Sequence, residues 1–527
     1  MKSLLKGVKE FFWPPSPEIR LRRGELTLWA MLLAVAYLPL PLGFIAWFAL
    51  ARPLAILFRL ETREAFKAAY FFFFMANLFH LYWVAVVTPP GMVAAVVILS
   101  LYPAVIIAAA VRLAAVKKIL GPLALPVLWV GMEYFRSLTE FAFPWTDLAY
   151  SQGYYLTFIQ IVSVIGIGGL SLFIMIMNIL VWQTFLKNNR LETRVSTAIA
   201  FIGLTAAIYI YGWIVMPPVH EEGDIRVSLL QGNVDLETKW KPETRDLNFV
   251  LYDSLARSVS DDSVDLIVWP ETAAPTYPRH ELKYFRMLAE TARRSAAPNL
   301  VGALDVVASD GKEKSYNSAF QIMPEGYISH VFHKVKLVPF SEHAPYQDYM
   351  PFLTRDFLAR YLDIIKTREV QWWADFYPGD SIVIFDIDQS RYAVLICFEA
   401  AFPDFVRQCV LKGARFLVNI TNDTWFGRSP GPFQHMRIAV FRAVENRIWV
   451  ARCANSGISA FIDPYGRERA RAGLYSQKVL TGNLYPIRDY PLFTRLGPVV
   501  GRYSFYIMLM TLALLTFRWG YRRIIGR

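Results

Sequence analysis

Long runs of apolar residues dominate the first 216 positions of the chain, and one more run lies close to the C-terminus. A helix needs about 20 predominantly apolar residues to cross a bilayer, and these runs come close to that length. The runs span residues 26–41, 43–58, 67–87, 91–114, 121–137, 157–185, 196–216 and 499–517. A turn at Pro39 and Pro41 separates the first two, and the fifth run is short. The pattern predicts a polytopic α-helical membrane domain of about eight transmembrane helices.

The segment between the seventh and eighth runs has a different pattern. Short apolar strands alternate there with amphipathic helical stretches. Three of the strands read "VDLIVWPE" (264–271), "YAVLICFE" (392–399) and "RFLVNITND" (415–423), and a helical pattern follows each of them. This alternation is typical of a layered α/β domain. We therefore expect an α/β domain over residues 220–495, inserted between two membrane helices.

Basic residues gather at both chain ends and between apolar runs, and this distribution predicts the orientation of the chain. The basic segments are 1–23, 59–67, 112–118, 187–194 and 518–527, whereas the loop 86–91 has neither Lys nor Arg. The positive-inside rule then puts both termini in the cytoplasm. Residues 24–219 would carry seven helices, 496–527 the eighth helix and a cytoplasmic tail, and 220–495 would lie outside.

Composition also indicates a membrane protein. Hydrophobic residues make up 55% of the chain and its mean hydropathy is +0.32, above the usual range of soluble proteins. Three cysteines cannot form a disulfide framework. The net charge of +12 does not indicate nucleic acid, because the basic residues lie where juxtamembrane anchors lie. Since 23 mostly polar or basic residues precede the first run, we expect a retained anchor rather than a cleaved signal.

Three segments of the outer domain end in residues that can react. "LIVWPE" ends on Glu271, "VLIC" ends on Cys397, and "HVFHKVKLVPFSE" carries Lys334 and, eight residues later, Glu342. Catalytic groups of α/β sheets gather at the carboxyl ends of strands. Each residue alone also has a structural explanation: Glu271 as a helix cap, Lys334 as a solvated charge, Cys397 as a core residue. Together they supply a base, a cation and a nucleophile at equivalent positions.

These residue types suit acyl transfer through a cysteine. A thiol becomes a strong nucleophile when it loses its proton, and a carboxylate such as Glu271 can accept that proton near neutral pH. The ammonium of Lys334 can stabilise the oxyanion of a tetrahedral intermediate, helped by the backbone N–H just after the nucleophile. Glu342 can hold the lysine in position. Cys409 and Cys453 lie in a helical pattern and in a strand that lack this setting.

Glutamate, lysine and cysteine in this chain order, within "WPE", "KVKLVPFSE" and "CFE", resemble the nitrilase superfamily of carbon–nitrogen hydrolases. The membrane frame and further motifs resemble one branch of it, the apolipoprotein N-acyltransferases of bacterial inner membranes. These motifs are "FPWTDLAYSQG" (143–153), "QGNVDLETKW" (231–240), "YNSAF" (316–320), "NDTWFG" (422–427) and "ANSGISAFIDPYGR" (454–467). The resemblance covers nearly the whole chain and implies a nitrilase-like αββα sandwich for the outer domain.

The resemblance implies that the roles known in this family apply to the matching residues. The resemblance implies that Glu271 is the general base, Lys334 the oxyanion stabiliser and Cys397 the acylated nucleophile. It implies supporting or substrate-binding roles for Glu342, Glu399, Phe398, Trp240, Asn317 and Phe340. Two positions depart from the family motif, with Ser341 in place of glycine and Phe398 in place of tyrosine. Phe398 keeps the aromatic bulk and the backbone N–H but loses a hydroxyl.

The implied activity moves an acyl chain from a phospholipid, through a cysteine thioester, to the N-terminal amine of the diacylglyceryl-cysteine of an apolipoprotein. The implied partners are this donor, this acceptor and the bilayer, with no cofactor, metal or nucleic acid. We expect a monomer in the bacterial inner membrane, with the catalytic domain on the periplasmic side.

Two other functions remain as alternatives. One is a membrane-anchored amidase that hydrolyses a small carbon–nitrogen substrate, which would not need eight spans. The other is a transporter or receptor whose outer domain only binds a ligand. Most of the apolar runs lack charge, and this argues against a transporter.

Histidines offer two further interpretations of the site. His330 and His333 are three apart and point to opposite faces of a strand, so we expect no metal site there with His343. His435 could form a Cys–His dyad with Cys397, but we expect it at the start of a surface helix.

Two segments have a structural and a functional interpretation. Residues 345–379 are rich in aromatic residues and predict either a packed helical insertion or a lid at the bilayer interface. The run "GIGG" (166–169) lies inside a predicted span, which favours a helix-packing or kink site over a phosphate loop.

Overall fold

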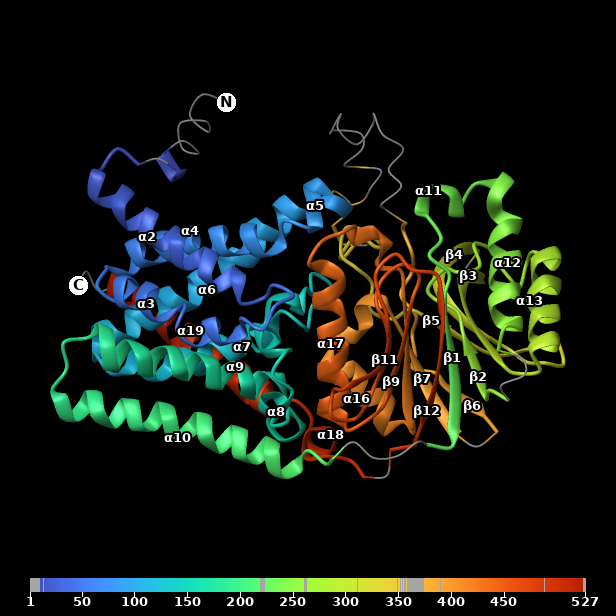
Figure 1. Cartoon of the computed structure of the whole chain (residues 1–527). Coiled ribbons are helices and arrows are strands. Elements are labelled where there is room, and N and C mark those ends of the chain that lie inside the picture. Colours follow the sequence, from blue (N-terminus) through green and yellow to red (C-terminus); the bar gives the residue numbers. More distant parts are fainter. Residues whose placement is uncertain are drawn as a thin grey trace.

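The computed structural model describes residues 10–524, except for positions 13, 219–222, 260–262, 310, 348, 351, 353, 355–356, 358–373, 389 and 488. It has two parts, a bundle of helices and an α/β part (Figure 1). Much of the aromatic segment predicted over 345–379 lies outside the described residues, and its interpretation stays a prediction.

The bundle is formed by the helices of the first 216 residues together with the last helix (Figure 1). They are α2 (Pro17–Val35), α3 (Ala51–Leu57), α4 (Thr62–Leu81), α5 (Val84–Val87), α6 (Pro89–Val116), α7 (Leu120–Phe135), α8 (Leu156–Ile159), α9 (Val162–Val181), α10 (Leu191–Val215) and α19 (Val499–Ile524). All eight predicted apolar runs contain helix. Among the described residues, four helices are long and apolar enough to cross a membrane: Pro89–Val116, Val162–Leu186, Leu191–Val215 and Val499–Arg518.

The remaining runs are shorter or more polar than the sequence pattern suggested. Charged residues occupy the first two turns of α2 and α4. The second run divides into a 3₁₀ turn at Gly43–Trp47 and the seven-residue helix α3, and α7 has only 16 residues. The structure therefore supports a membrane protein with four clear candidate spans, and not directly the eight that we expected.

Over the residues that the structure describes, the α/β part is built from two six-stranded sheets. The first has the order β12-β1-β2-β3-β4-β5 and the second β11-β10-β9-β8-β7-β6. The strands are β1 (Ile225–Gln231), β2 (Leu266–Val268), β3 (Asn299–Ser309), β4 (Lys312–Ile322), β5 (Ile328–His333), β6 (Ile384–Ile387), β7 (Ser390–Ile396), β8 (Phe416–Thr421), β9 (Val450–Ala454), β10 (Ser459–Ile462), β11 (Glu468–Ala472) and β12 (Lys478–Leu484). In each sheet three strands are parallel, β1-β2-β3 and β7-β8-β9, and the other pairs are antiparallel.

The two sheets face each other, and helices cover their outer faces. Side chains meet between them, for example where Tyr392 of β7 donates to Gln321 of β4 at 2.7 Å. Helices α12 (Pro242–Arg257) and α13 (Leu282–Ser295) lie outside the first sheet, whereas α16 (Pro403–Leu411) and α17 (Gly431–Asn446) lie between the second sheet and the bundle (Figure 1). This is the αββα sandwich that the resemblance implied.

The strand order brings reactive residues to one edge of the sandwich. Glu271 follows β2 closely, Cys397 comes directly after β7, and Asn422 comes directly after β8. Because β7 and β8 are parallel neighbours, Cys397 and Asn422 leave their sheet at the same edge. Cys409 lies in α16 and Cys453 in β9, as the sequence pattern predicted, and both are buried.

A buried carboxylate, that of Glu445 in α17, joins the α/β part to the bundle at a kink in α9. Gly166 of "GIGG" has φ +65°, so the helix breaks there and the Ile167 N–H loses its partner in the preceding turn. Glu445 of α17 accepts this N–H at 3.1 Å. The same carboxylate pairs with Arg442 at 2.9 Å, and both side chains are fully buried. The kink prediction is confirmed, and the kink also serves as a docking point.

Glu445→Ala is expected to destabilise the whole protein, because it leaves the Arg442 charge buried without its partner. Breaking a buried pair in this way costs about 3–5 kcal/mol, so the apparent unfolding temperature in detergent should fall clearly. The double variant Arg442→Met/Glu445→Gln removes both charges and keeps an acceptor for Ile167. It should recover most of the stability, and equal loss in both variants would contradict the role given to this pair.

Candidate active site

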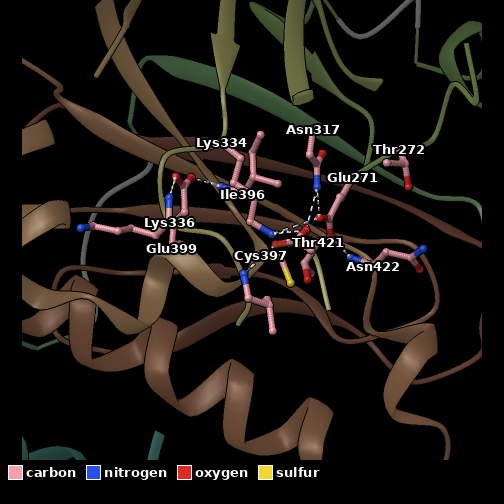
Figure 2. Close-up of polar contacts among 12 residues, drawn as sticks. Glu271, Thr272, Asn317, Lys334, Lys336, Ile396, Cys397, Glu399, Thr421 and Asn422 are labelled. Carbon is pink, nitrogen blue, oxygen red and sulfur yellow. Dashed lines mark hydrogen bonds and ion pairs between the residues drawn. The ribbon is translucent and has the colours of Figure 1, made fainter. Parts of the chain in front are cut away.

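Three predicted residues come together at the edge where β2, β5 and β7 end. Glu271, Lys334 and Cys397 lie in one buried cluster, with the cysteine sulfur beside the other two side chains (Figure 2). Lys334 Nζ is 3.6 Å from Glu271 Oε1. Both charged side chains are almost completely buried, with exposed fractions of 1% for Lys334 and 8% for Glu271. Cys397 is partly exposed.

Hydrogen bonds fix the carboxylate of Glu271 at both oxygens. Asn317 of β4 donates to Oε1 at 2.7 Å, and the backbone N–H of Asn422 donates to Oε2 at 2.8 Å. These donors come from opposite sheets, so Glu271 bridges the sandwich (Figure 2). A carboxylate held at both ends keeps its orientation toward the cysteine.

Lys334 is paired more closely with Glu342 than with Glu271. Its Nζ lies 2.8 Å from Glu342 Oε1, and Asn317 donates to the same oxygen at 3.2 Å. The other oxygen of Glu342 accepts the N–H of Val338 at 2.9 Å. Burial disfavours the charged form of Lys334, but Glu342 and Glu271 outweigh it and raise the pKa of the lysine. The lysine therefore stays charged in this setting.

The backbone at Cys397 is held in an unusual conformation. Its φ is +52°, in the left-handed region that non-glycine residues rarely adopt. Burial, followed by the charge of Glu271, raises the pKa of the Cys397 thiol, whereas Lys334 lowers it. The raised pKa means that the resting thiol is protonated at neutral pH.

Glu399 holds the turn that carries Cys397. Its Oε2 accepts the N–H of Ile396 at 2.7 Å, and its Oε1 accepts the N–H groups of Val335 and Lys336 at 2.7 and 3.2 Å. Its side chain thus ties the end of β7 to the segment that follows Lys334 (Figure 2). Burial raises the pKa of Glu399 to about 7, although these three N–H groups lower it. The Glu399 carboxylate therefore fixes the position of Cys397.

An apolar pocket opens beside Cys397. It has about 950 Å³ of empty space, its open mouth included, and Cys397, Phe398, Phe340 and Ser341 are among its lining residues. The first half of α6 contributes Gly91, Ala94, Ala95, Ile98 and Leu99 to the wall. The remaining wall comes from residues 83, 84, 87, 88, 141, 143, 145, 338, 339 and 426. Because α6 is a candidate membrane span, the pocket extends from the thiol to the membrane part.

The other predicted residues lie at different distances from this pocket. Asn317 contacts both Glu271 and Glu342, and Phe398 stacks on Phe143 with ring centroids 5.9 Å apart. Trp240 is 45% exposed and is not among the residues that line the pocket, so its substrate role stays a prediction.

The structure adds Lys239, which the sequence reasoning missed although it lies within "QGNVDLETKW". Lys239 is buried and donates to the Glu271 carbonyl at 3.3 Å and to Thr272 Oγ1 at 2.7 Å. Burial lowers its pKa to about 7, although Glu271 raises it. Lys239 therefore anchors the backbone that carries Glu271.

His435 is placed differently from our expectation. We expected it at the start of a surface helix, but it is fully buried in α17. Its Nδ1 lies 2.8 Å from Asp423 Oδ1, and its Nε2 lies 3.1 Å from the carbonyl oxygen of Cys397. The contact with Cys397 is therefore made to the backbone oxygen. Over the described residues, no group of three or more His, Cys, Asp and Glu side chains is arranged to hold a metal ion.

Comparison with known proteins identifies the family. The profile "Apolipoprotein N-acyltransferase N-terminal domain" matches residues 29–180, and the profile "Carbon-nitrogen hydrolase" matches residues 226–486. The apolipoprotein N-acyltransferase of Geobacter metallireducens is 33% identical over 485 residues, which cover 89% of this chain and 90% of that protein. This chain belongs to the apolipoprotein N-acyltransferase family. The family member of Chlorobaculum tepidum is 31% identical over 480 residues, 86% of this chain and 87% of that protein.

The family that the motifs indicated is thus confirmed. The same matches support the predicted nitrilase-like α/β domain and the prediction of an acyltransferase that acts on lipoproteins. Among solved structures, a Nesterenkonia amidase from the nitrilase superfamily is similar to this chain, with 17% identity and a TM-score of 0.39. That similarity covers 54% of this chain and 99% of the amidase.

Glu399→Gln is expected to damage the site without removing any atom that reacts. Glutamine has one acceptor oxygen, so its NH₂ group would face at least one of the three N–H donors. A buried donor left unsatisfied costs about 1–3 kcal/mol, and the Cys397 turn should shift. We expect a lower unfolding temperature and a large loss of N-acyltransferase activity.

Glu290→Gln is the matched control, because Glu290 forms only exposed ion pairs with Arg293 and Arg294. It should behave as the wild type. Full activity in Glu399→Gln would show that the Cys397 turn does not depend on this carboxylate.

Proposed function

We propose that this apolipoprotein N-acyltransferase takes its acyl chain from a phospholipid and carries it as a thioester on Cys397. The acceptor is the N-terminal amine of the diacylglyceryl-cysteine of an apolipoprotein. The observation that carries the proposal is the apolar pocket, which joins the thiol to a candidate membrane helix. A pocket of this kind suits an acyl chain and offers little to a small polar amide.

In the first half-reaction, Cys397 Sγ attacks the carbonyl carbon of the phospholipid ester while its proton passes to Glu271. Lys334 and the backbone N–H of Phe398 stabilise the oxyanion. The ester C–O bond then breaks, and the proton on Glu271 moves to the departing glyceryl oxygen. The lysophospholipid leaves, and the acyl chain remains on Cys397 in a thioester.

In the second half-reaction, the amine of the acceptor attacks the thioester carbonyl. Glu271 takes a proton from the amine, the C–S bond breaks, and the proton returns to the Cys397 sulfur. Glu342 keeps the lysine charged and in position throughout both steps. Transfer to an amine requires that water be kept out, and the apolar wall of the pocket favours this.

The substrates also account for the membrane part. Both the phospholipid and the diacylated acceptor have acyl chains in a bilayer, so the pocket must open toward it. The charge pattern of the loops favours eight spans, both termini in the cytoplasm and the α/β part on the periplasmic side of the inner membrane. We further expect the protein to act as a monomer, without a cofactor.

A product assay separates this function from its alternative, a membrane-anchored amidase. Purified protein is incubated with a phospholipid and a synthetic diacylated lipopeptide, and the products are weighed by mass spectrometry. We expect a triacylated peptide and an equal amount of lysophospholipid. Free fatty acid without triacylated peptide would mean hydrolysis and would overturn the proposal, and so would an unchanged phospholipid.

The pocket is expected to select donors by the length of their acyl chain. Ala95→Phe puts a bulky ring into the pocket wall on α6, so long-chain donors should lose more activity than short-chain donors. Val93→Phe is the control, because Val93 lies on the same helix with 57% exposure and outside the pocket wall. The assay compares initial rates for donors that differ only in acyl length. An equal loss for all chain lengths would argue that the acyl chain lies elsewhere.

A further inference from the structure

His435 is a buried group close to the nucleophile that the mechanism above does not use. It is fully buried, and its two ring nitrogens contact Asp423 and the carbonyl oxygen of Cys397. A carbonyl oxygen only accepts hydrogen bonds, so the contact of 3.1 Å requires a hydrogen on Nε2. Asp423 is a charged carboxylate and also only accepts, so the ring makes both hydrogen bonds when each of its nitrogens carries a hydrogen. Burial and Arg452 lower the pKa of His435, whereas Asp423 and the Cys397 carbonyl favour this doubly protonated form.

The carbonyl that His435 contacts belongs to the same peptide unit as the N–H of Phe398. The C=O and N–H of a trans peptide lie in one plane and point in opposite directions. A donor that fixes the carbonyl of Cys397 therefore also fixes the direction of the Phe398 N–H. Phe398 is the second residue of a short 3₁₀ helix, Cys397–Ala401, and N–H groups in a first turn have no partner within their helix. This N–H is the backbone donor that the acylation step assigns to the oxyanion.

His435 is itself held by a buried chain of charged groups. Asp423 pairs with Arg452 at 2.8 Å, and Thr421 donates to the same carboxylate at 3.0 Å. Although burial raises it, Arg452 and His435 bring the pKa of Asp423 down to about 2, so this carboxylate is charged. The ring of Trp145, from the bundle, packs against His435 with centroids 5.3 Å apart. These contacts leave the imidazole one orientation.

The backbone at Cys397 needs rigid support from its surroundings because its φ is +52°. A non-glycine residue in this region persists when the surrounding structure over-determines it. Glu399 fixes the peptide between Leu395 and Ile396 through the N–H of Ile396, one residue before Cys397, and His435 fixes the peptide after Cys397 through the Cys397 carbonyl. The two contacts hold the strained residue from both sides.

We propose that His435 is a positioning residue for the oxyanion hole: by donating to the Cys397 carbonyl it orients and polarises the peptide whose N–H, on Phe398, stabilises the oxyanion. A hydrogen bond to a peptide oxygen strengthens donation by the N–H of that peptide. The inference rests on the proposed function in its choice of Cys397 as the acylated nucleophile, but not on the identity of the acyl donor. We assign His435 no direct contact with the reacting atoms, because its two ring nitrogens contact Asp423 and the Cys397 carbonyl.

Two substitutions separate the two contacts of the ring. The amide nitrogen of glutamine takes the place of Nε2, so His435→Gln can still donate to the Cys397 carbonyl and loses the contact with Asp423. The amide of asparagine takes the place of Nδ1, so His435→Asn keeps the contact with Asp423 and loses the one with Cys397. If the carbonyl contact matters, the glutamine variant should work and the asparagine variant should fail.

The readouts are two reactions of Cys397, of which only one forms an oxyanion. Acylation by p-nitrophenyl butyrate passes through a tetrahedral oxyanion, forms the thioester and releases nitrophenolate, while the thiol proton goes to Glu271. Alkylation by iodoacetamide displaces iodide and forms no oxyanion. Cys397→Ala gives the background of both reactions, since Cys409 and Cys453 are buried.

We expect His435→Asn to slow acylation about 10–100-fold, somewhat less than the loss of a whole oxyanion donor, and to leave alkylation within about twofold. His435→Gln should stay within about threefold of the wild type in both reactions. The inference is overturned if His435→Asn acylates at the wild-type rate. It is also overturned if either variant loses acylation and alkylation equally, because the role would then be structural only.

A third incubation of the same proteins, with phospholipid as the donor, distinguishes the failure of this inference from the failure of the proposed function. If the wild type reacts with the nitrophenyl ester but never with a phospholipid, the donor is wrong and the role of His435 stands. If it takes acyl chains from phospholipid and the two variants do not differ, the role of His435 is wrong and the proposed function stands.

Discussion

The site depends on one buried ammonium. Lys334 Nζ lies 2.8 Å from Glu342 and 3.6 Å from Glu271, and its side chain is 1% exposed. A buried charge without a partner costs several kcal/mol, so this lysine requires the carboxylates of Glu342 and Glu271 beside it. Burial, followed by the charge of Glu271, raises the pKa of the Cys397 thiol, and Lys334 acts against them. The cluster therefore opposes a resting thiolate at Cys397.

The αββα sandwich supplies this arrangement from distant parts of the chain. Glu271 follows β2 in the first sheet, and Cys397 follows β7 in the second. Asn317 on β4 and the backbone N–H of Asn422 after β8 both donate to the carboxylate of Glu271. Both hydrogen bonds can form only when the two sheets are packed correctly against each other. The membrane part completes the site from the other side, because α6 and residues 141, 143 and 145 form much of the pocket wall.

The sequence predicted much of this fold for physical reasons. Apolar strands followed by amphipathic helices leave few alternatives to a layered α/β domain, and residues at strand ends converge when the strands are parallel. The number of spans was harder to predict, because hydropathy does not reveal that the second run divides into a 3₁₀ turn and a short helix, or that α7 has only 16 residues.

Contacts between residues far apart in the chain could not be predicted from the sequence either. His435 looked like a surface residue because the sequence does not show that Asp423 and the Cys397 carbonyl lie beside it. Lys239 went unnoticed for the same reason, since its partner Thr272 is 33 residues away in the chain. Trp240 is the opposite case, because we predicted it at the site. Its sequence neighbour Lys239 contacts the backbone of Glu271, whereas Trp240 itself is 45% exposed.

The central claim is that Cys397, with Glu271 as its base, carries the acyl chain of a phospholipid. Intact-protein mass spectrometry after incubation with a phospholipid, and without any acceptor, tests it most directly. The wild type should gain the mass of one acyl chain, which hydroxylamine removes, and Cys397→Ala should gain none. Glu271→Gln should acquire the chain about 10²–10⁴-fold more slowly, as expected when a positioned general base is lost. An acyl chain on Cys397→Ala, or normal acylation of Glu271→Gln, would contradict the account.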